Sequence, residues 1–334
     1  MEAQTLWPIN MTVGRAPGQW PAMSQNEERP WMVDPECPWW AKLRRAEHLI
    51  DEIETRYQAL NRPGGAWVVV REVDAEQAVV YRIRLLQPIS ADFAVVVADA
   101  IHNLRSALDQ VAYHLAVQHS GPLSDDAERL TGFPIRISGS RFDEWAASTD
   151  RRTKLRRLDI FGDAGVRAIR SVQPFAFAEE AGAITGPSGE DAVGRSLEDE
   201  RDNDPGFVLN TLWNVDKHRR LPGLAWVMSG LWWTGSSEKG LRTAPLYKPL
   251  DDGQLLARDV GIRSDEHDRE VHFEFDVELL DSPAQGDRPL VHTLRDLHRS
   301  LGSWMIPRML HVADGNEPPL MISFQPPQAK TCGS

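Results

Sequence analysis

The sequence predicts an α+β protein in which long core helices pack on an antiparallel sheet. Apolar residues recur at roughly helical spacing in three long segments, at residues 38–60, 93–115 and 289–313. A β-branched run at 66–73 and an alternating run at 271–280 are typical of strands. We therefore expect helices and a sheet to share one core.

The first part of the chain predicts a helix, a hairpin and a longer helix. The helix at Pro38–Leu60 should end at the Asn-Arg-Pro-Gly-Gly turn that follows it. The runs at 66–73 and 78–86 are separated by Asp-Ala-Glu-Gln and predict a hairpin. Ser90 is a good N-cap for the long helix, which should end near His119 because Ser-Gly-Pro follows.

Shorter elements follow this helix. The Phe-Pro-Ile sequence predicts a short strand at residues 133–137. Ser140 is expected to cap a brief helix that ends at Trp145. Another helix is expected at residues 162–172, just before a Gln-Pro turn.

The last third of the chain predicts a helix, strands and a final helix. Residues 207–217 should be helical, because their apolar positions face one side. Residues 221–233 should form one or two strands. Pro307 should kink or divide the helix at 289–313, because proline lacks the N–H that a helix interior needs.

Composition divides the chain into four segments. The arm at residues 1–37 is rich in Trp and Pro and has no periodicity, so its tryptophans should pin it to the body or contact a protein partner. Residues 179–206 are acidic and rich in Gly and Ser, which predicts a flexible loop. The longer segments, 38–178 and 207–328, are expected to pack as one domain.

Charge and cysteine content restrict the partners and the compartment. The formal net charge of -12 argues against broad charge-driven nucleic-acid binding, which needs clustered Lys and Arg. We expect no signal peptide, and no membrane span because the apolar run at 221–233 is short and contains Pro and Gly. Cys37 and Cys332 lie near opposite ends of the sequence and predict neither a zinc site nor a disulfide framework, which fits a cytoplasmic protein.

The most informative feature is a polar stripe on the long helix. Opposite the apolar face lie short hydrogen-bonding residues, among them Asp99, His102 and Asn103. A solvated face would normally carry Glu and Lys, so the stripe predicts a second packed interface. A second polar cluster, Asn-Val-Asp-Lys-His-Arg-Arg, lies at residues 214–220. We expect the two clusters to form one polar site.

One interpretation of this site is a metal centre. Asp99 and His102 are three positions apart, which lets both side chains reach one ion above a helix face. Asp216 and His218 are expected to complete the ligand set. Carboxylate and imidazole ligands of this kind suit a divalent zinc, manganese or iron ion.

A second interpretation is a purely structural network. His102 then donates to Asp109 or Asp216, and Arg105 forms a bidentate pair with one of these carboxylates. Such a network fixes the packing of two helices without any catalysis. Loss of one member of a buried pair costs on the order of 3–5 kcal/mol, so stability alone explains such residues.

A third interpretation is phosphodiester chemistry, which needs a general acid or base and cations that neutralise phosphate charge. The candidate catalytic residues are His102, Arg105, Asp109, Lys217 and His218. The candidate substrate-binding residues are Asn103, Arg219, Arg152 and Arg156. The last two belong to a basic run at 151–157 that suits a nucleic-acid backbone, although an ordinary solvated surface has the same pattern.

Four motifs in order carry a resemblance to a known family. The chain reads His-Asn-Leu-Arg-Ser-Ala-Leu-Asp at 102–109, Phe-Pro-Ile at 133–135, Gln-Pro at 173–174 and Asp-Lys-His-Arg at 216–219. It resembles an uncharacterised bacterial family, common in actinobacteria, with HNxRSxLD and DKHR motifs. The resemblance implies no established activity.

A weaker resemblance is to HEPN ribonucleases, which are helical and often belong to toxin or phage-defence systems. Their signature is a closely spaced Arg–His pair, whereas the histidine that follows Arg105 here is His114. Two functions are therefore expected. The first is an enzyme acting on a nucleic acid or other phosphate-bearing substrate, with a defence or stress role. The second is a non-catalytic binding or scaffold protein whose motif residues form a buried network.

Overall fold

The computed structural model describes most of the chain outside its ends. The described residues are 37–62, 64–176, 204–217, 221–234, 241–260, 270–283 and 289–317. Over these residues the protein has helices and antiparallel sheets, so the predicted α+β class is confirmed. The predicted arm, apart from residue 37, and most of the predicted acidic loop lie outside the described residues. None of the described helices is long and apolar enough to cross a membrane.

The chain divides into two compact units. Among the described residues, the first unit takes Asp51–Val97 and Leu221–Thr293, and the second takes the remainder. Both units therefore draw on both of the long segments at 38–178 and 207–328. All the described candidate site residues belong to the second unit.

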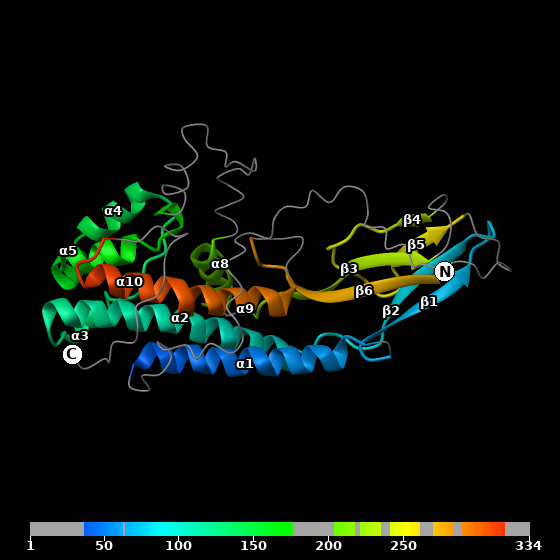
Figure 1. Ribbon diagram of the computed structural model, residues 1–334, viewed down its shortest axis with the longest axis horizontal. Coiled ribbons are helices and arrows are strands. Elements are labelled where there is room, and N and C mark those ends of the chain that lie inside the picture. Colours follow the sequence, from blue (N-terminus) through cyan, green and yellow to red (C-terminus); the bar gives the residue numbers. More distant parts are fainter. Residues whose placement is uncertain are drawn as a thin grey trace. The chain divides into compact units, whose positions relative to one another are not determined.

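The first unit contains two antiparallel sheets (Figure 1). One has the order β1-β2-β5-β4, and the other pairs β3 with β6. The strands are β1 (Trp67–Val73), β2 (Val79–Leu85), β3 (Leu224–Thr234), β4 (Leu241–Thr243), β5 (Leu255–Asp259) and β6 (Glu270–Leu279). The predicted β1–β2 hairpin is confirmed, and its turn is held by Arg258, whose Nε donates to Asp74 Oδ2 at 2.7 Å.

Most of the remaining elements are helices. They are α1 (Pro38–Leu60), α2 (Ala91–Ser120), α3 (Asp125–Glu128), α4 (Gly139–Ala147), α5 (Arg157–Arg170), α8 (Pro205–Lys217), α9 (Leu290–Ser300), η2 (Leu301–Met305) and α10 (Ile306–Ala313). In the second unit, α5 packs against both α4 and α10 (Figure 1). The predicted cap of α2 is confirmed, because Phe93 N donates to Ser90 Oγ at 3.1 Å.

The predicted division of the last helix is also confirmed. A π-helical segment, η2, separates α9 from α10 immediately before Pro307. Proline cannot donate the backbone hydrogen bond that would continue the α-helical pattern. The irregular turn therefore falls where the sequence predicts a break.

Three local predictions are wrong. Residues 133–137 form no strand, and α4 is capped by Ser138 rather than Ser140. The helix predicted from residue 162 begins earlier, at Arg157, and Gly162 marks a kink inside it with φ 62° and ψ 173°. A glycine tolerates this positive φ, so the residue that looks like a helix start is instead a bend.

The sequence predicts no disulfide framework, but Cys37 is disulfide-bonded. The other cysteine of the sequence, Cys332, lies outside the described residues.

Candidate functional site

The candidate site is built on one column of the α2 helix. His102, Arg105 and Asp109 are spaced three and four positions apart, so they lie above one another along the helix. Their environments differ strongly. Arg105 is 5% exposed, the Asp109 side chain is 36% exposed, and His102 is exposed. The exposure of the side chains therefore changes along this column, from the exposed His102 to the buried Arg105 and the partly exposed Asp109.

Arg105 and Asp109 fasten the segment at Phe133 to this helix. Arg105 Nη2 donates to Asp109 Oδ1 at 3.1 Å and also to the Phe133 carbonyl oxygen. The same Asp109 oxygen accepts the Phe133 N–H at 2.8 Å. The two side chains therefore satisfy both backbone groups of Phe133. We call this arrangement the Arg105 clamp.

A fully buried glutamine continues the fastening. Gln173 Nε2 donates to the carbonyl oxygens of Pro134 at 2.9 Å and Ile169 at 3.1 Å. Its Oε1 accepts the Arg136 N–H at 2.8 Å. Side chains thus satisfy the backbone groups that a sheet would otherwise pair, which is the physical reason that residues 133–137 form no strand. Gln173 is not among the site residues that the sequence predicts. The Gln-Pro motif at 173–174 is the feature of the sequence that indicates it.

Aromatic rings enclose the Arg105 guanidinium. The ring centroid of Trp213 lies 4.8 Å from Cζ, and that of Phe133 lies 5.9 Å away. Burial lowers the pKa of Arg105 from its ordinary value, and the charge of Asp109 opposes that shift. Nε and Nη1 are buried and have no hydrogen-bond partner among the residues that the structure describes.

The polar stripe of α2 is open at its first turns. Asp99 and His102 are exposed, and Asn103 Nδ2 donates to the Asp99 carbonyl oxygen at 2.8 Å. His102 Nε2 lies 3.4 Å from Ser106 Oγ. Because Asp99 and His102 face outward, the predicted second packed interface does not cover them. The predicted donation from His102 to Asp109 is not formed, since His102 bonds along the helix instead.

Trp213, which directly precedes the second polar cluster, contacts Arg105 of the first. Trp213 belongs to α8, and Asp216 and Lys217 follow it by about one helical turn. The side chains of Asp216 and Lys217 are not described, and His218 and Arg219 lie outside the described residues. Their assigned roles stay predictions. The contact of Trp213 with Arg105 is the link that the described residues provide.

The predicted metal ligands are only partly described. Among the described residues, no group of three His, Cys, Asp or Glu side chains is arranged to hold a metal ion. Two members of the predicted set, Asp216 and His218, have no described side chains. The predicted divalent metal therefore stays a prediction.

The two arginines selected from the basic run are engaged with carboxylates of the same chain. Arg152 Nη2 donates to Asp126 Oδ1 at 2.7 Å. Arg156 makes a two-point contact with Asp159, in which Nε donates to Oδ2 at 2.9 Å and Nη2 donates to Oδ1. Both arginines are exposed. A phosphate would have to compete with these carboxylates.

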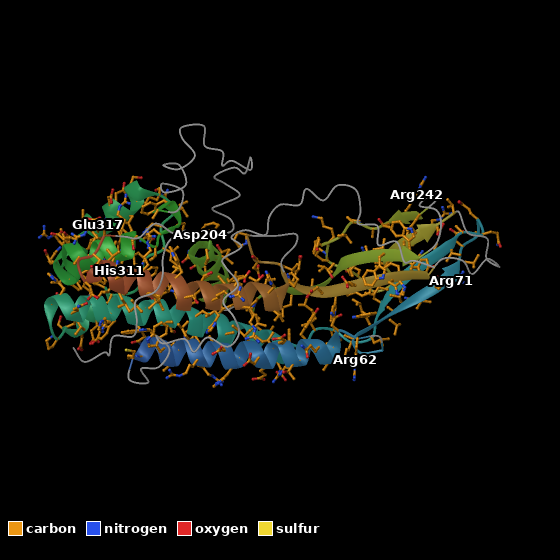
Figure 2. The ribbon with its side chains drawn as sticks, in the orientation of Figure 1. Arg62, Arg71, Asp204, Arg242, His311 and Glu317 are labelled. Carbon is orange, nitrogen blue, oxygen red and sulfur yellow. The ribbon has the colours of Figure 1, made fainter. Side chains whose placement is uncertain are left out.

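Asp204 is a buried acid that sequence reasoning missed. It lies at the start of α8 (Figure 2), where its Oδ1 accepts the Phe207 N–H at 2.8 Å. Burial raises its pKa to about 7, while hydrogen bonds from the Phe207 and Gly206 backbone lower it. An acid followed by proline is a typical helix start, and that signal was present in the sequence.

No family model matches this chain, and neither a curated protein nor a solved structure matches it. The functional interpretation therefore depends on the contacts around α2. These contacts divide the predicted site residues into a buried clamp and an exposed stripe.

Proposed function

We propose that this chain is a non-catalytic binding or scaffold protein in which the HNxRSxLD residues hold the fold of the second unit. The observation that carries this proposal is the Arg105 clamp. Arg105 Nη2 and Asp109 Oδ1 are bonded to the backbone of Phe133 and to each other. Residues with such roles are required for folding whether or not any reaction occurs.

The motifs that carry the family resemblance support the same proposal. Phe133 and Pro134 supply the backbone groups, and Arg105, Asp109 and Gln173 supply the side chains that bind them. One network thus gives three of the four motifs a structural reason. Membership of the resembled family itself stays a prediction.

The exposed Asp99 and His102, with the half-buried Asn103 beside them, form the surface that we assign to partner binding. These side chains are short and polar, and they protrude from a helix whose other side is buried in the core. Their hydrogen-bonding groups are suited to a protein surface with matching donors and acceptors. The arm at 1–37 is a further predicted partner segment.

The first test compares the stability lost on replacing the buried Arg105 with that lost on replacing the exposed His102. We expect Arg105→Met to lower the free energy of unfolding by about 3 kcal/mol, because it leaves the Phe133 carbonyl and Asp109 without their donor. His102→Ala is the matched control on the same column, and it should change stability by less than about 0.5 kcal/mol. Urea unfolding of both variants gives the answer. Equal stability of Arg105→Met and the wild type would contradict the proposal.

A second candidate function is an enzyme acting on a nucleic acid or other phosphate-bearing substrate, with a defence or stress role. The exposure of His102 favours it, because a general acid or base must reach its substrate. Hydrolysis of RNA or an activated phosphodiester, with and without Mn²⁺, tests this function. The enzyme function requires that the wild type hydrolyses one of these substrates. It also requires that His102→Ala abolishes this hydrolysis without changing stability. Activity that survives in His102→Ala would remove His102 from the mechanism.

A further inference from the structure

The clamp leaves part of the Arg105 guanidinium without an acceptor. Nη2 donates to Asp109 and to Phe133, whereas Nε and Nη1 have no hydrogen-bond partner among the residues that the structure describes. The side chain is only 7% exposed, so bulk solvent does not hydrate these N–H groups freely. Buried donors without an acceptor are rare in folded proteins, and a bound water or ion is a common acceptor.

The charge balance favours an anion over water. Among the described carboxylates, Asp109 alone contacts the guanidinium, and it does so through one nitrogen at 3.1 Å. The same carboxylate oxygen also accepts the Phe133 N–H, so its negative charge is shared. Burial lowers the pKa of Arg105, which means that the surroundings disfavour the cation. A second negative charge would stabilise it.

The geometry restricts how such a ligand approaches. The rings of Trp213 and Phe133 lie near Cζ, and neither ring offers a conventional oxygen acceptor to Nε–H or Nη1–H. A ligand must therefore reach the guanidinium along the directions of its free N–H bonds. A carboxylate or phosphate oxygen is a strong acceptor for such an N–H group, because the hydrogen bond is charge-assisted. Nε–H and Nη1–H point to opposite edges of the guanidinium, so one small anion reaches only one of them.

We propose that Arg105 binds a small oxyanion, a phosphate or a carboxylate, through Nη1–H beside the Trp213 ring. This inference goes beyond the proposed function, because it assigns a ligand to the Arg105 clamp, which that proposal treats as structural. The Arg105 clamp holds the guanidinium in place through Nη2. The bound oxyanion then supplies the acceptor that Nη1 lacks.

The first experiment measures the melting temperature of the full chain against added salt at pH 7. Sodium phosphate, sodium acetate and sodium chloride are compared at matched ionic strength. We expect a saturable rise in melting temperature with phosphate or with acetate that chloride does not produce, because a ligand of the native state raises stability by mass action. The salt that produces the saturable rise identifies the oxyanion. An equal shift in all three salts would overturn the proposal.

Variants then locate the site. Arg105→Lys should weaken the apparent affinity about tenfold or more, since an ammonium cannot reproduce the guanidinium fork. Arg152→Lys, at an exposed arginine, is the control and should leave affinity unchanged. Asp109→Asn should bind the oxyanion more tightly although it is less stable, because a neighbouring negative charge is removed. Weaker binding together with lower stability would contradict the site.

A measurement on the wild type covers the case in which Arg105→Lys does not fold. In ¹⁵N-arginine-labelled protein, the Nε–H resonance of Arg105 is assigned through its proximity to the Trp213 ring. We expect this resonance to move in proportion to site occupancy. A resonance that stays fixed while phosphate and acetate are added would overturn the oxyanion site. The scaffold proposal would survive that result, because it depends on the stability of the clamp variants.

Discussion

The indole ring of Trp213 lies over the guanidinium of Arg105, with 4.8 Å between the ring centroid and Cζ. This contact joins α8 to α2. A cation beside an indole face is stabilised by the negative potential of the ring, and more so where water is excluded. Arg105 therefore depends on Trp213 as well as on Asp109.

Trp213→Leu should lower the free energy of unfolding by about 2 kcal/mol. The change removes the cation–π contact and part of the cover over a buried cation. Trp213→Phe is the matched control, because it keeps an aromatic face, and it should lose about half as much. Urea unfolding measures both. Equal losses in the two variants would mean that ring volume, and not cation–π stabilisation, is what Trp213 supplies.

Gln173→Leu should lower the free energy of unfolding by about 3 kcal/mol, although leucine is apolar and the site is buried. The leucine side chain is apolar and leaves the Pro134 carbonyl and the Arg136 N–H without their buried partner. Gln110→Leu is the control on half-buried α2 surface, with an expected change of less than about 0.5 kcal/mol. Chemical denaturation decides, and similar stabilities for the two variants would argue against the role of Gln173 in fastening residues 134–136.

Because the pKa of Asp204 is raised, we expect the free energy of unfolding to fall as the pH rises. Its pKa of about 7 in the folded protein lies above the ordinary value of 3.8. Between about pH 4 and pH 7 the folded state therefore binds more protons than the unfolded state, so its advantage is lost as the pH rises through the folded pKa. Asp204→Asn keeps a good N-cap without this titration. At pH 8 the variant should be more stable than the wild type by on the order of 2 kcal/mol.

The pH dependence of that difference is the control. At pH 5 the Asp204 carboxyl is neutral in the folded state, so the advantage of Asp204→Asn should shrink strongly. Urea unfolding at a series of pH values measures both proteins. A difference that stays constant from pH 5 to pH 8 would show that Asp204 does not titrate in this range.

Gly162→Ala should destabilise the second unit for two separable reasons. The backbone has φ 62° and ψ 173°, a region that is essentially restricted to glycine. An added Cβ would also lie 2.4 Å from His119 Nδ1. We expect a loss of about 2–3 kcal/mol. In a double-mutant cycle, His119→Ala should relieve the clash and leave the backbone strain, whereas full recovery would mean that strain contributes nothing.

Much of the fold follows from short-range patterns in the sequence. The 23-residue helix α1 and the 30-residue helix α2 have regular apolar spacing and clear end signals, and both lie where the sequence predicts them. The hairpin of β1 and β2 has the same local origin. Such elements are predictable because the residues that determine them are neighbours in the chain.

The site was predictable in its members but not in its arrangement. The motif around Arg105 identified the polar residues of α2, yet the choice between Asp109 and other partners depended on the fold. Phe133 looks like a strand residue because its neighbours are apolar. Its backbone groups are instead bonded by Arg105 and Asp109, which lie 28 and 24 positions away. No local pattern records contacts over that separation.

The sequence by itself determined the long helices α1 and α2 and the hairpin of β1 and β2, and it determined that α2 carries a polar stripe. Tertiary structure alone decided that Arg105 is buried against Trp213 and Phe133 while His102, three positions earlier, is exposed. The physical reason is that periodicity defines the faces of a helix, whereas burial depends on which distant segments pack against each face. In α2 those segments include the loop at Phe133 and the helix of Trp213.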